Sequence, residues 1–523
     1  MYTGSVQPLE LKGRRFEMLS SIHQWLEGVS YQCQKQGETL PAVTGVASDS
    51  RKVKRGDLFV AVPGSTLDGR RFIPDAISRG ASAVVSEPLG DSNYSIGVPC
   101  FIVPHARKAI AQIAANAFGR PADRLKSIGV TGTNGKTTIS FLIQFLVGLK
   151  HPTGIVGTVH YDDGKKKCAA HQTTPGPLEL HERLSRMRTN GLTHVVMEIS
   201  SHALDQDRTF GITFSEAVFT NLTQDHLDYH HDFEHYFAAK KKLFLEEPRP
   251  RRAVVNIDDP FGVSLVRELK RDQVITFGIR EPADVCAKSL TVGLTSVEFD
   301  LVTDGMEYRV KAPLGLSLNV YNLLAALAVA HSEGVSLKDA IGALENFKGV
   351  CGRMERIEEG QDFQFFIDYA HTPDALRNVL SETGKRSRSR IISVFGCGGD
   401  RDRGKRALMG AVAAQYSDLV IVTSDNSRSE DPESIFKDIR QGIDSKHAVL
   451  QIADREEAIR HAIQTAQAGD IVFLFGKGHE RYQIVGNQSY PFSDHEVARN
   501  YLRKLSLALS FSSPRPRRGR GLG

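Results

Sequence analysis

The chain has 523 residues, which is too long for one hydrophobic core and predicts two to four domains. Hydrophobic residues make up 41% and charged residues 24% of it, as in an ordinary globular protein. The N-terminus lacks a signal pattern and no apolar run approaches the roughly 20 residues of a membrane span, so we expect a cytoplasmic protein without a membrane partner. Six scattered cysteines without paired spacing fit reduced thiols better than a disulfide framework or a zinc site.

The net charge of +5 comes mostly from the C-terminus. Residues 512–523 contain four arginines and no acid, and a segment this rich in proline, arginine and glycine cannot bury enough apolar surface to fold. We therefore expect a disordered, solvated basic tail, with an anion-binding role as the alternative. The rest of the chain is nearly neutral, which argues against a nucleic-acid partner.

Short apolar strands alternate with helical stretches along three α/β segments, which we expect at 1–118, 119–350 and 351–511. Continuous apolar strands separated by helices indicate mostly parallel sheets that are covered on both faces. The predicted strands are 57–62 and 83–86 in the first segment, 125–130, 193–198 and 217–220 in the second, and 390–395, 419–423 and 471–475 in the third.

A phosphate-binding loop follows the strand 125–130. Glycines in this loop let backbone N–H groups approach phosphate oxygens, and the following helix adds a favourable dipole. We expect Lys136 to neutralise the β- and γ-phosphates of ATP and the Thr137 hydroxyl to bind Mg²⁺. The general pattern would place glycine where Val130 stands, so the loop is a variant. The predicted ATP-binding residues here are Gly132, Thr133, Asn134, Gly135, Lys136, Thr137 and Thr138.

Two further residues are candidate magnesium ligands. Glu198 ends a buried strand, and ligands collect at the carboxyl edge of an open α/β sheet. His226 lies in a polar, histidine-rich loop after the next strand; we expect most of the histidines there to be solvated and His226 alone to be a ligand. Without cysteines in the loop, zinc is not favoured.

Lys240 stands in the apolar stripe of a predicted helix, with Phe233, Tyr236, Phe237, Leu243 and Phe244. Its position alone favours a lysine that extends its ammonium to solvent. The alternative is a desolvated, neutral amine that reacts with CO₂ to give a carbamate able to bind Mg²⁺.

The loop Gly-Thr-Asn-Gly-Lys-Thr-Thr resembles the ATP loop of the Mur ligase family, whose relatives include folylpolyglutamate synthetase. The resemblance covers about residues 40–505 and implies an N-terminal UDP-binding α/β domain, a central P-loop ATPase domain and a C-terminal Rossmann-like domain. It also implies a carbamylated lysine at Lys240, one Mg²⁺ held by Thr137 and Glu198, and a second held by Glu198, His226 and the carbamate. Further ATP contacts are implied at Asn322, Arg353 and Asp368.

Other motifs resemble the substrate sites of the family members that add the third residue of the peptidoglycan stem peptide. The UDP-sugar-dipeptide contacts implied in this way are Ser50, Ser65, Thr66, Gln172, Thr173, Thr174, Ser200, Gln206 and Arg208. The implied amino-acid contacts are Arg401, Asp425, Asn426, Ser427, Arg428, Gly476 and Glu480. Arginine can grip the far carboxylate of meso-diaminopimelate and Glu480 its ammonium. Ser427 replaces a proline that is usual in diaminopimelate-adding members.

The expected function is therefore ATP- and Mg²⁺-dependent addition of meso-diaminopimelate to UDP-MurNAc-L-Ala-D-Glu through an acyl-phosphate, in the cell-wall synthesis that supports cell shape and division. Alternatives are L-lysine as the amino acid, a folylpolyglutamate-type ligase, or a nucleic-acid motor that uses the basic tail. A motor would need basic and aromatic residues interleaved across the domains, yet the chain has one tryptophan. We expect a monomer. No general base stands out, although His202 and His371 lie near the right motifs.

Overall fold

The computed structural model describes residues 20–34, 41–64, 67–88 and 97–512, which fall into two compact units. The first unit contains the described residues up to Leu125 together with Pro175–Thr189 and Ala203–Ile212. The second contains Lys126–Thr174, Asn190–His202 and the described residues from Thr213 onward. The described part of the third segment and most of the second thus lie in the second unit, and the expected boundaries at 118, 350 and 511 stay predictions. Apart from Ser512, the expected basic tail lies outside the described residues.

The first unit is built on a five-stranded sheet of order β2-β7-β6-β5-β4, in which only β2 runs antiparallel. Leu58 and Val60 pack with α3 on one face, and Phe59 and Ala61 pack with α2 on the other, so both faces are covered as expected. The elements are β1 (Ser20–Ser21), α1 (Ile22–Trp25), β2 (Gln32–Gln34), β3 (Ala42–Val43), β4 (Gly45–Ala47), η1 (Ser50–Lys52), β5 (Asp57–Ala61), η2 (Gly69–Phe72), α2 (Ile73–Ser78), β6 (Ala83–Ser86), β7 (Cys100–Ile102), α3 (Ala106–Ala117), η3 (Pro121–Arg124) and α5 (Pro177–Thr189).

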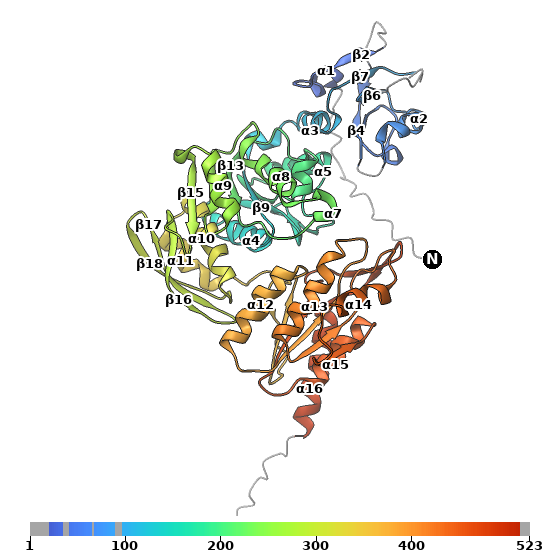
Figure 1. Ribbon diagram of the computed structural model, residues 1–523. Helices are drawn as coiled ribbons and strands as arrows, with labels where there is room; N and C mark the ends of the chain where they lie inside the picture. The colour runs from blue at the N-terminus through green and yellow to red at the C-terminus, as the bar shows by residue number, and fades with distance from the viewer. Residues whose placement is uncertain (1–19, 35–40, 65–66, 89–96, 513–523) are drawn as a thin grey trace, which may run out of the picture. The chain divides into compact units, whose positions relative to one another are not determined.

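The second unit begins with an eleven-stranded sheet of order β11-β10-β9-β12-β8-β13-β14-β15-β16-β17-β18. Strands β9, β12, β8, β13, β14, β15 and β16 are parallel to their neighbours in that run. Helices α4 and α10 pack against one face, seen in Figure 1, while Leu243 of α8 packs against Gly129 of β8. The strands are β8 (Lys126–Thr131), β9 (Thr153–Val156), β10 (His160–Asp162), β11 (Lys167–Ala169), β12 (His194–Glu198), β13 (Phe214–Phe219), β14 (Arg252–Asn256), β15 (Val274–Gly278), β16 (Val285–Val292), β17 (Val297–Thr303) and β18 (Met306–Ala312). The helices are α4 (Lys136–Val147), α6 (Ser201–Asp205), α7 (Leu227–His230), α8 (Phe233–Leu245), α9 (Pro260–Glu268), η4 (Arg271–Gln273), α10 (Leu318–Ser332), α11 (Leu337–Ala343) and η5 (Leu344–Asn346).

Two features of this part of the chain, one in the sheet and one in a helix, differ from the expectation. Strands β16, β17 and β18 form an antiparallel meander, whose second turn is the pair Asp304-Gly305 with both residues at positive φ. The sequence predicts an alanine-rich helix at 323–330 with asparagines as its cap, but α10 begins five residues earlier, at Leu318, and contains those asparagines. Asn319 and Asn322 are buried there.

The third segment forms a six-stranded sheet of order β19-β20-β24-β21-β22-β23, parallel except at β19. Helices α12, α13 and α14 lie side by side against one face, and α15 and α16 cover the other (Figure 1). The elements are β19 (Glu355–Arg356), β20 (Gln364–Asp368), α12 (Pro373–Arg386), β21 (Ile391–Phe395), α13 (Gly404–Tyr416), β22 (Leu419–Val422), α14 (Pro432–Arg440), β23 (Val449–Gln451), α15 (Arg455–Thr465), β24 (Ile471–Phe475), β25 (Tyr482–Val485), β26 (Gln488–Pro491) and α16 (Asp494–Ser512).

Several helices start at a polar cap followed by proline. Thr372 accepts a hydrogen bond from the Ala375 N–H, and Pro373 occupies the first helical position of α12. Asp259 and Asp431 cap α9 and α14 in the same way, each before a proline. The cap at Thr372 matters for the site because it fixes where α12 begins.

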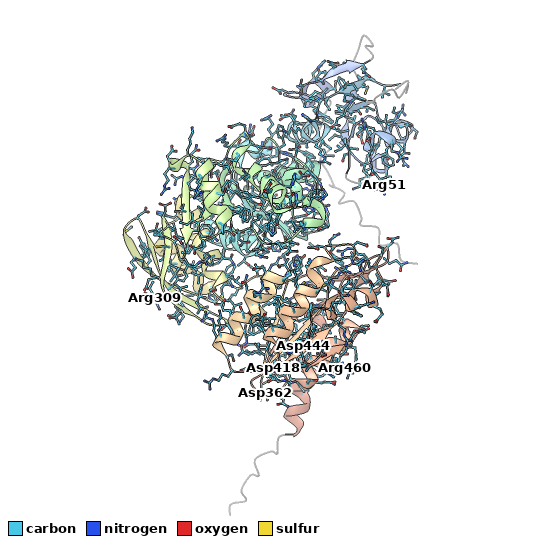
Figure 2. The ribbon with its side chains drawn as sticks, viewed as in Figure 1. Arg51, Arg309, Asp362, Asp418, Asp444 and Arg460 are labelled. Carbon is cyan, nitrogen blue, oxygen red and sulfur yellow. The ribbon has the colours of Figure 1, made fainter. Side chains whose placement is uncertain are left out.

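Charged side chains on the outside are largely compensated by neighbours of opposite sign. Of the arginines labelled in Figure 2, Arg51 pairs with Asp49, Arg309 with Glu298 and Asp300, and Arg460 with Glu457. Exposed pairs of this kind each contribute only about 0–1 kcal/mol. Among the helices of the described residues, none has the length and apolar character needed to cross a lipid bilayer.

Candidate active site

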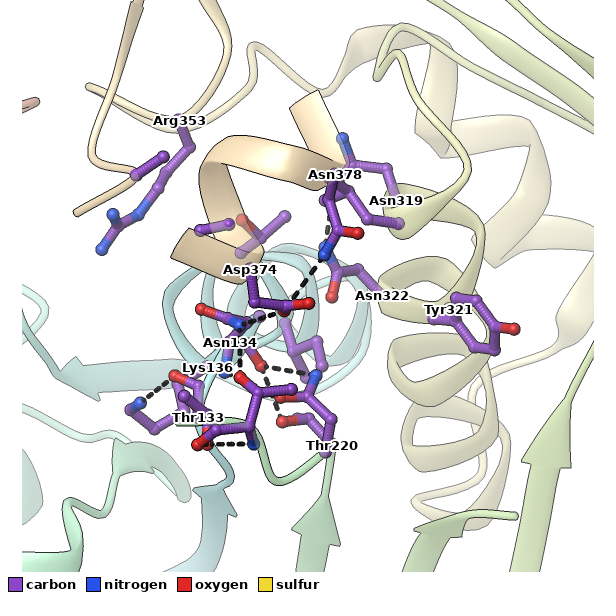
Figure 3. Close-up of a pocket in the computed structure, with 18 of the residues that line it drawn as sticks. Thr133, Asn134, Lys136, Thr220, Asn319, Tyr321, Asn322, Arg353, Asp374 and Asn378 are labelled. Atoms are coloured by element: carbon purple, nitrogen blue, oxygen red, sulfur yellow. Dashed lines mark hydrogen bonds between the residues drawn. The ribbon is translucent and has the colours of Figure 1, made fainter. Parts of the chain in front are cut away.

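The second unit contains a cavity of about 850 Å³ at the carboxyl ends of β8 and β13. Its lining comes from the loop between β8 and α4, from the segment after β13, from α8 and α10, and from the start of the third segment (Figure 3). Most of the predicted ATP-binding residues lie on this lining, namely Thr133, Asn134, Gly135, Lys136, Thr137, Thr138, Asn322, Arg353 and Asp368.

Two glycines shape the loop between β8 and α4. At Gly132 (φ 145°) a Cβ atom would lie 1.8 Å from Thr220 Oγ1, and at Gly135 (φ 89°) it would lie 2.6 Å from Asn322 Oδ1. Both distances are below any real contact, and both φ values favour glycine. From the sequence, we explained these glycines by the close approach of the backbone to a phosphate. The structure adds a second reason, because each glycine leaves room for a side chain from a neighbouring element.

Lys136 lies over the loop that precedes it. Its Nζ donates hydrogen bonds to the carbonyls of Gly132 at 2.9 Å and Thr133 at 2.8 Å. Burial lowers the pKa of Lys136, and the carboxylates of Glu198 and Asp225 oppose that shift. The loop thus holds an ammonium among backbone carbonyls at the start of a helix, where phosphate groups are favoured.

Thr137 and Glu198, predicted to bind one metal, are hydrogen-bonded to each other. The Thr137 hydroxyl donates to Glu198 Oε2 at 2.8 Å, and Thr158 donates through its N–H and its hydroxyl to the two carboxylate oxygens. Glu198 is fully buried. Arg353 donates to Thr137 Oγ1 at 2.9 Å, a contact that joins the third segment to helix α4. A carboxylate and a hydroxyl together offer the oxygen ligands that Mg²⁺ prefers.

Lys240 lies on the apolar face of α8, as the periodicity predicted, but it is 1% exposed and does not extend to solvent, which its position alone had favoured. Its Nζ donates to the Gly132 carbonyl at 2.8 Å and lies 4.4 Å from the centre of the Tyr236 ring. Burial, reinforced by Lys136, holds the pKa of Lys240 well below its usual range. One member of the predicted stripe does not belong to the buried face, because Phe233 at the start of the helix is 38% exposed.

The histidine-rich segment after β13 is a short helix, α7, rather than a polar loop. His230 is buried and shares a hydrogen bond with Ser201 Oγ at 2.9 Å, so it is an exception to the expectation that most of these histidines are solvated. Its imidazole fills the space beside the Tyr236 ring, 5.1 Å between centroids.

Asp225, which was not predicted as a site residue, lies between His226 and His371. Its Oδ2 lies 3.4 Å from His226 Nε2 and 3.9 Å from His371 Nε2. Although burial opposes it, the charges of these histidines, with Lys405 and Lys136, hold the pKa of Asp225 well below its usual range. Burial lowers the pKa of His226 to about 3 against the pull of Asp225, so the imidazole is neutral and able to bind a metal.

The predicted nucleotide contacts of the later segments lie on the cavity wall but are partly engaged. Asn322 donates to Asn319 Oδ1 at 2.8 Å. Asp368 is buried and accepts from the N–H groups of Met354 and Ala370, which positions the neighbouring Arg353. The guanidinium of Arg353 lies 4.3 Å from the centre of the Tyr369 ring.

Asp374, which the sequence did not single out, joins helix α12 to the phosphate loop. Its Oδ2 accepts from Asn134 Nδ2 at 3.3 Å and from Asn378 Nδ2 at 3.2 Å, as Figure 3 shows. The sequence feature that could have revealed Asp374 is the helix start at Thr372-Pro373, because it places this acid in the first turn of α12.

The predicted amino-acid contacts gather at the carboxyl edge of the third-segment sheet, after β21, β22 and β24. Asn426 donates to Glu480 Oε2 at 2.9 Å, and Arg428 donates to the Gly399 carbonyl at 2.7 Å. Arg428 adopts φ 51°, and repulsion from Arg401 adds to burial in lowering its pKa. At Gly476 (φ 108°) a Cβ atom would lie 2.8 Å from Asp425 Oδ2. Ser427, which follows in the same loop, is buried.

Lys477 is a partner that the sequence did not reveal. It is fully buried and contacts Glu480 Oε2 at 2.9 Å and Asn426 Oδ1 at 3.1 Å. Glu480 therefore already has a cation beside it, and its Oε2 accepts hydrogen bonds from both Lys477 Nζ and Asn426 Nδ2.

Gly352 presses the backbone before Arg353 against the loop that carries Glu480. A Cβ atom at Gly352 (φ 68°) would lie 2.4 Å from the His479 nitrogen and 2.5 Å from the Gly478 carbonyl carbon. The nucleotide-side and amino-acid-side segments are therefore in direct backbone contact.

The predicted UDP-substrate residues are divided between the units. In the first, Ser50 is buried at the start of η1, and Arg208 donates to Gln206 Oε1 at 2.7 Å. Ser65 and Thr66 lie outside the described residues.

In the second unit, the remaining predicted residues of this kind surround Glu198. Thr174 Oγ1 donates to the Glu198 carbonyl at 2.7 Å and accepts from the Ser200 N–H at 3.0 Å. Thr173 contacts Thr158 through their hydroxyls, and the Gln172 carbonyl accepts from Tyr161.

Comparison with known proteins gives matches over most of the chain. Residues 42–118 match the model described as Mur ligase family, catalytic domain, residues 130–330 the Mur ligase middle domain, and residues 352–478 the Mur ligase, glutamate ligase domain. Relatives named UDP-N-acetylmuramoyl-L-alanyl-D-glutamate--2,6-diaminopimelate ligase occur in Geobacillus kaustophilus (strain HTA426), 44% identical over 88% of this chain and 94% of that protein, and in Solibacter usitatus (strain Ellin6076), 45% identical over the same shares. A solved structure of a ligase of that name is 36% identical, with a TM-score of 0.61 over 89% of this chain and 95% of the other.

Proposed function

This chain belongs to the Mur ligase family, and we propose that it joins meso-diaminopimelate to UDP-MurNAc-L-Ala-D-Glu with ATP and Mg²⁺. The products are UDP-MurNAc-tripeptide, ADP and phosphate, and the reaction belongs to peptidoglycan precursor synthesis in the cytoplasm. One observation carries the proposal: a phosphate-type loop, a buried carboxylate–hydroxyl pair and a buried lysine gather around one cavity whose wall continues into the third segment.

The residues present suit magnesium. We propose that Thr137 and Glu198 hold one Mg²⁺, since they already share a hydrogen bond and offer oxygen atoms. The depressed pKa of Lys240 favours the free amine, which can add to CO₂; an N–C bond forms, one proton is released, and a carbamate anion results. Glu198, His226 and this carbamate are the proposed ligands of a second Mg²⁺. The metals supply charge neutralisation between the γ-phosphate and the acceptor carboxylate.

The protein's own residues position the nucleotide and the acid. Lys136 is placed to neutralise the phosphates that replace its carbonyl partners, and Arg353 approaches the same region from the third segment. We propose that Asn322 contacts the nucleotide and that Asp368 acts through Arg353, because both of its oxygens accept backbone N–H groups. The side-chain carboxyl of D-Glu takes the γ-phosphoryl group, and the amine then displaces phosphate.

The UDP-linked substrate is proposed to bind residues from both parts of the chain. In the first unit these are Ser50, Gln206 and Arg208, with Ser65 and Thr66 from the sequence. In the second unit they are Gln172, Thr173, Thr174 and Ser200, of which Thr173 and Ser200 line the cavity.

For the incoming amino acid we propose meso-diaminopimelate rather than L-lysine. Arg401 and Arg428 lie close enough for their charges to interact unfavourably, and a carboxylate between them would relieve that repulsion. Lysine has no carboxylate at its far end. Asp425 and Glu480 supply negative charge for the far ammonium, with Asn426 and Gly476 forming the loops that hold them.

The test is phosphate release from ATP with UDP-MurNAc-L-Ala-D-Glu and either diaminopimelate, L-lysine or no amino acid. We expect release to require the UDP-substrate, Mg²⁺ and an amino acid, and to be fastest with diaminopimelate. Equal rates with lysine would refute the amino-acid assignment. Release that proceeds without the UDP-substrate would refute the ligase.

A further inference from the structure

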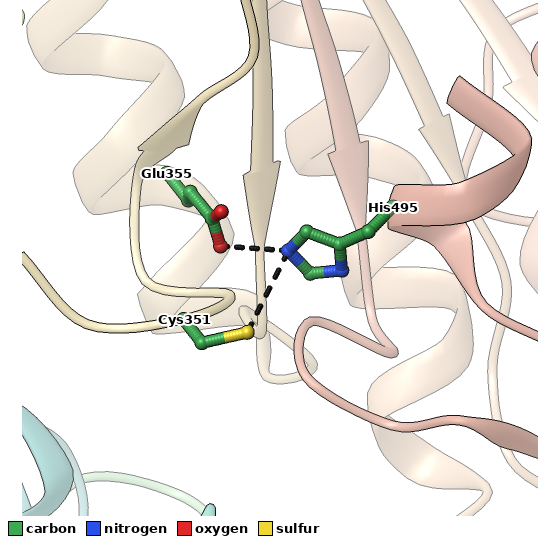
Figure 4. Close-up of side chains that lie close together, drawn as sticks. All are labelled: Cys351, Glu355 and His495. Atoms are coloured by element: carbon green, nitrogen blue, oxygen red, sulfur yellow. Dashed lines mark hydrogen bonds and ion pairs between the residues drawn. The ribbon is translucent and has the colours of Figure 1, made fainter. Parts of the chain in front are cut away.

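Cys351, Glu355 and His495 place a sulfur, an oxygen and a nitrogen atom within 4.8 Å of one another, away from the cavity lining (Figure 4). His495 Nε2 lies 2.6 Å from Glu355 Oε2 and 3.7 Å from Cys351 Sγ. The same ring nitrogen therefore faces both partners. The Cys351 side chain is exposed and the other two are half-buried, so the cluster opens to solvent.

These three atoms are of the types that bind zinc. Zn²⁺ binds Cys, His and carboxylate ligands at about 2.0–2.3 Å, so two ligands of one tetrahedral ion lie roughly 3.3–3.8 Å apart. The Cys351–His495 distance already falls in that range. The Glu355–His495 distance is that of a hydrogen bond and would lengthen by somewhat less than 1 Å, a change within reach of side-chain rotation.

Rigid elements hold two of the three ligands in place, while Cys351 lies in the turn before β19. Glu355 begins β19, which pairs with β20, and its Oε2 also accepts from the Gly352 N–H at 2.8 Å. His495 is the second residue of α16, directly after Asp494, whose carboxylate makes two 2.8 Å hydrogen bonds with Arg455 in a fully buried pair. Sites anchored in this way keep their geometry better than sites on loops alone.

We propose that Cys351, Glu355 and His495 form a binding site for a thiophilic divalent cation, with Zn²⁺ as the preferred ion and water completing its coordination. Sulfur is a poor ligand for Mg²⁺, so this site and the oxygen-rich cavity would select different metals. The site is separate from the proposed ligase chemistry and stands whether or not that proposal holds.

The consequence lies in the residue between two ligands. In the sequence, Arg353 stands between Cys351 and Glu355, two residues from each, and its guanidinium donates a hydrogen bond to Thr137. An ion that links both flanks to α16 fixes the path of this segment, and with it the guanidinium at the mouth of the phosphate loop. Zinc occupancy would thus stabilise the arrangement that brings Arg353 to helix α4.

The experiment is a titration of the full chain, freed of metal with a chelator, with Co²⁺ as the spectroscopic probe and Zn²⁺ as its competitor. A thiolate bound to Co²⁺ gives a ligand-to-metal absorption band in the near ultraviolet. The cavity lining among the described residues contains no cysteine, so metal bound there cannot give this band. We expect one equivalent of Co²⁺ to produce the band and Zn²⁺ to displace it.

Three variants and a matched control decide the outcome. Cys351→Ser should abolish the band, and His495→Gln and Glu355→Gln should weaken Zn²⁺ binding by at least about 100-fold. Cys286→Ser, at a half-buried cysteine on β16, should leave both unchanged. Circular dichroism checks folding, and the exposed position of Cys351 makes its serine variant the safest reporter. No band with wild type, or a band that survives in Cys351→Ser, would overturn the proposal and leave the cluster as an ion pair beside a thiol.

Discussion

Replacing Lys240 by methionine should separate stability from activity. Methionine keeps the length and apolar stem of lysine but removes the ammonium. The Gly132 carbonyl would keep a partner, since Lys136 Nζ donates to it at 2.9 Å as well as Lys240 Nζ at 2.8 Å. The substitution therefore leaves no buried acceptor unpaired, and it removes an ammonium whose desolvation disfavours its charged form.

From these contacts we expect Lys240→Met to unfold at equal or higher denaturant concentration, with a gain of up to about 2 kcal/mol, as is typical when a functional residue is removed from a strained environment. If Lys240 holds a metal as proposed, its loss would forfeit several kcal/mol of transition-state stabilisation; about 4 kcal/mol corresponds to roughly a 10³-fold lower kcat. Stability is measured by urea unfolding and activity by phosphate release with all three substrates.

A shorter variant supplies the control. Lys240→Ala leaves space beside the Tyr236 ring, where a small carboxylate such as formate or acetate could take the place of the carbamate, so either acid should partly restore its activity. Lys240→Met fills that space and should not respond. The reasoning is refuted if Lys240→Met loses several kcal/mol of stability, or if it turns over at the wild-type rate.

Three further substitutions test other parts of the site and fold. Arg428→Ala should raise the KM for diaminopimelate by about 10–100-fold, the cost of one charged hydrogen bond, and leave the KM for ATP unchanged; an equal rise in both would contradict its role. Gly132→Ala should weaken nucleotide binding by about 10–100-fold because its Cβ would lie 1.8 Å from Thr220 Oγ1, whereas Gly342→Ala, with nothing within 4 Å, should bind normally in the same titration. Burial lowers the pKa of His181 to about 4, so between pH 6.5 and 4 the unfolded chain binds a proton that the folded chain does not, and stability falls on acidification. His181→Met should remove about 2 kcal/mol of the difference in unfolding free energy between pH 7.5 and pH 5, and an unchanged difference would count against it.

Much of the fold followed from local patterns. The strands that form the sheet cores are continuous apolar runs, and helical spacing placed Lys240 on the apolar face of its helix, although that spacing alone favoured an ammonium that reaches solvent. The start of α10 was misplaced because asparagine usually caps helices rather than entering them, while here Asn319 and Asn322 bond to each other inside one. The antiparallel meander carried a signal in Asp304-Gly305, a pair that favours a two-residue hairpin.

The predicted site residues were those with a recognisable local context, such as a glycine loop or a strand end. Most contacts of the missed ones join residues far apart in the chain, although His226 adjoins Asp225 and Glu480 lies three residues after Lys477. Asp225 is significant because two histidines and two lysines surround it, and Lys477 because it faces Glu480 and Asn426 in the fold. Likewise, nothing near Arg353 in the sequence indicates that it reaches Thr137. Such contacts depend on tertiary structure, which residue spacing does not encode.

The absence of a side chain at Gly352 has a consequence for the order of events. Because the backbone of Gly352 lies against Gly478 and His479, the turn leading to Arg353 cannot shift without displacing the loop of Glu480. If nucleotide and amine bind as proposed, the loop ordered by the first ligand would also restrict the loop that receives the second. A methyl group at position 352 would force the Arg353 turn away from the Glu480 loop, and each of them would then have to become ordered separately.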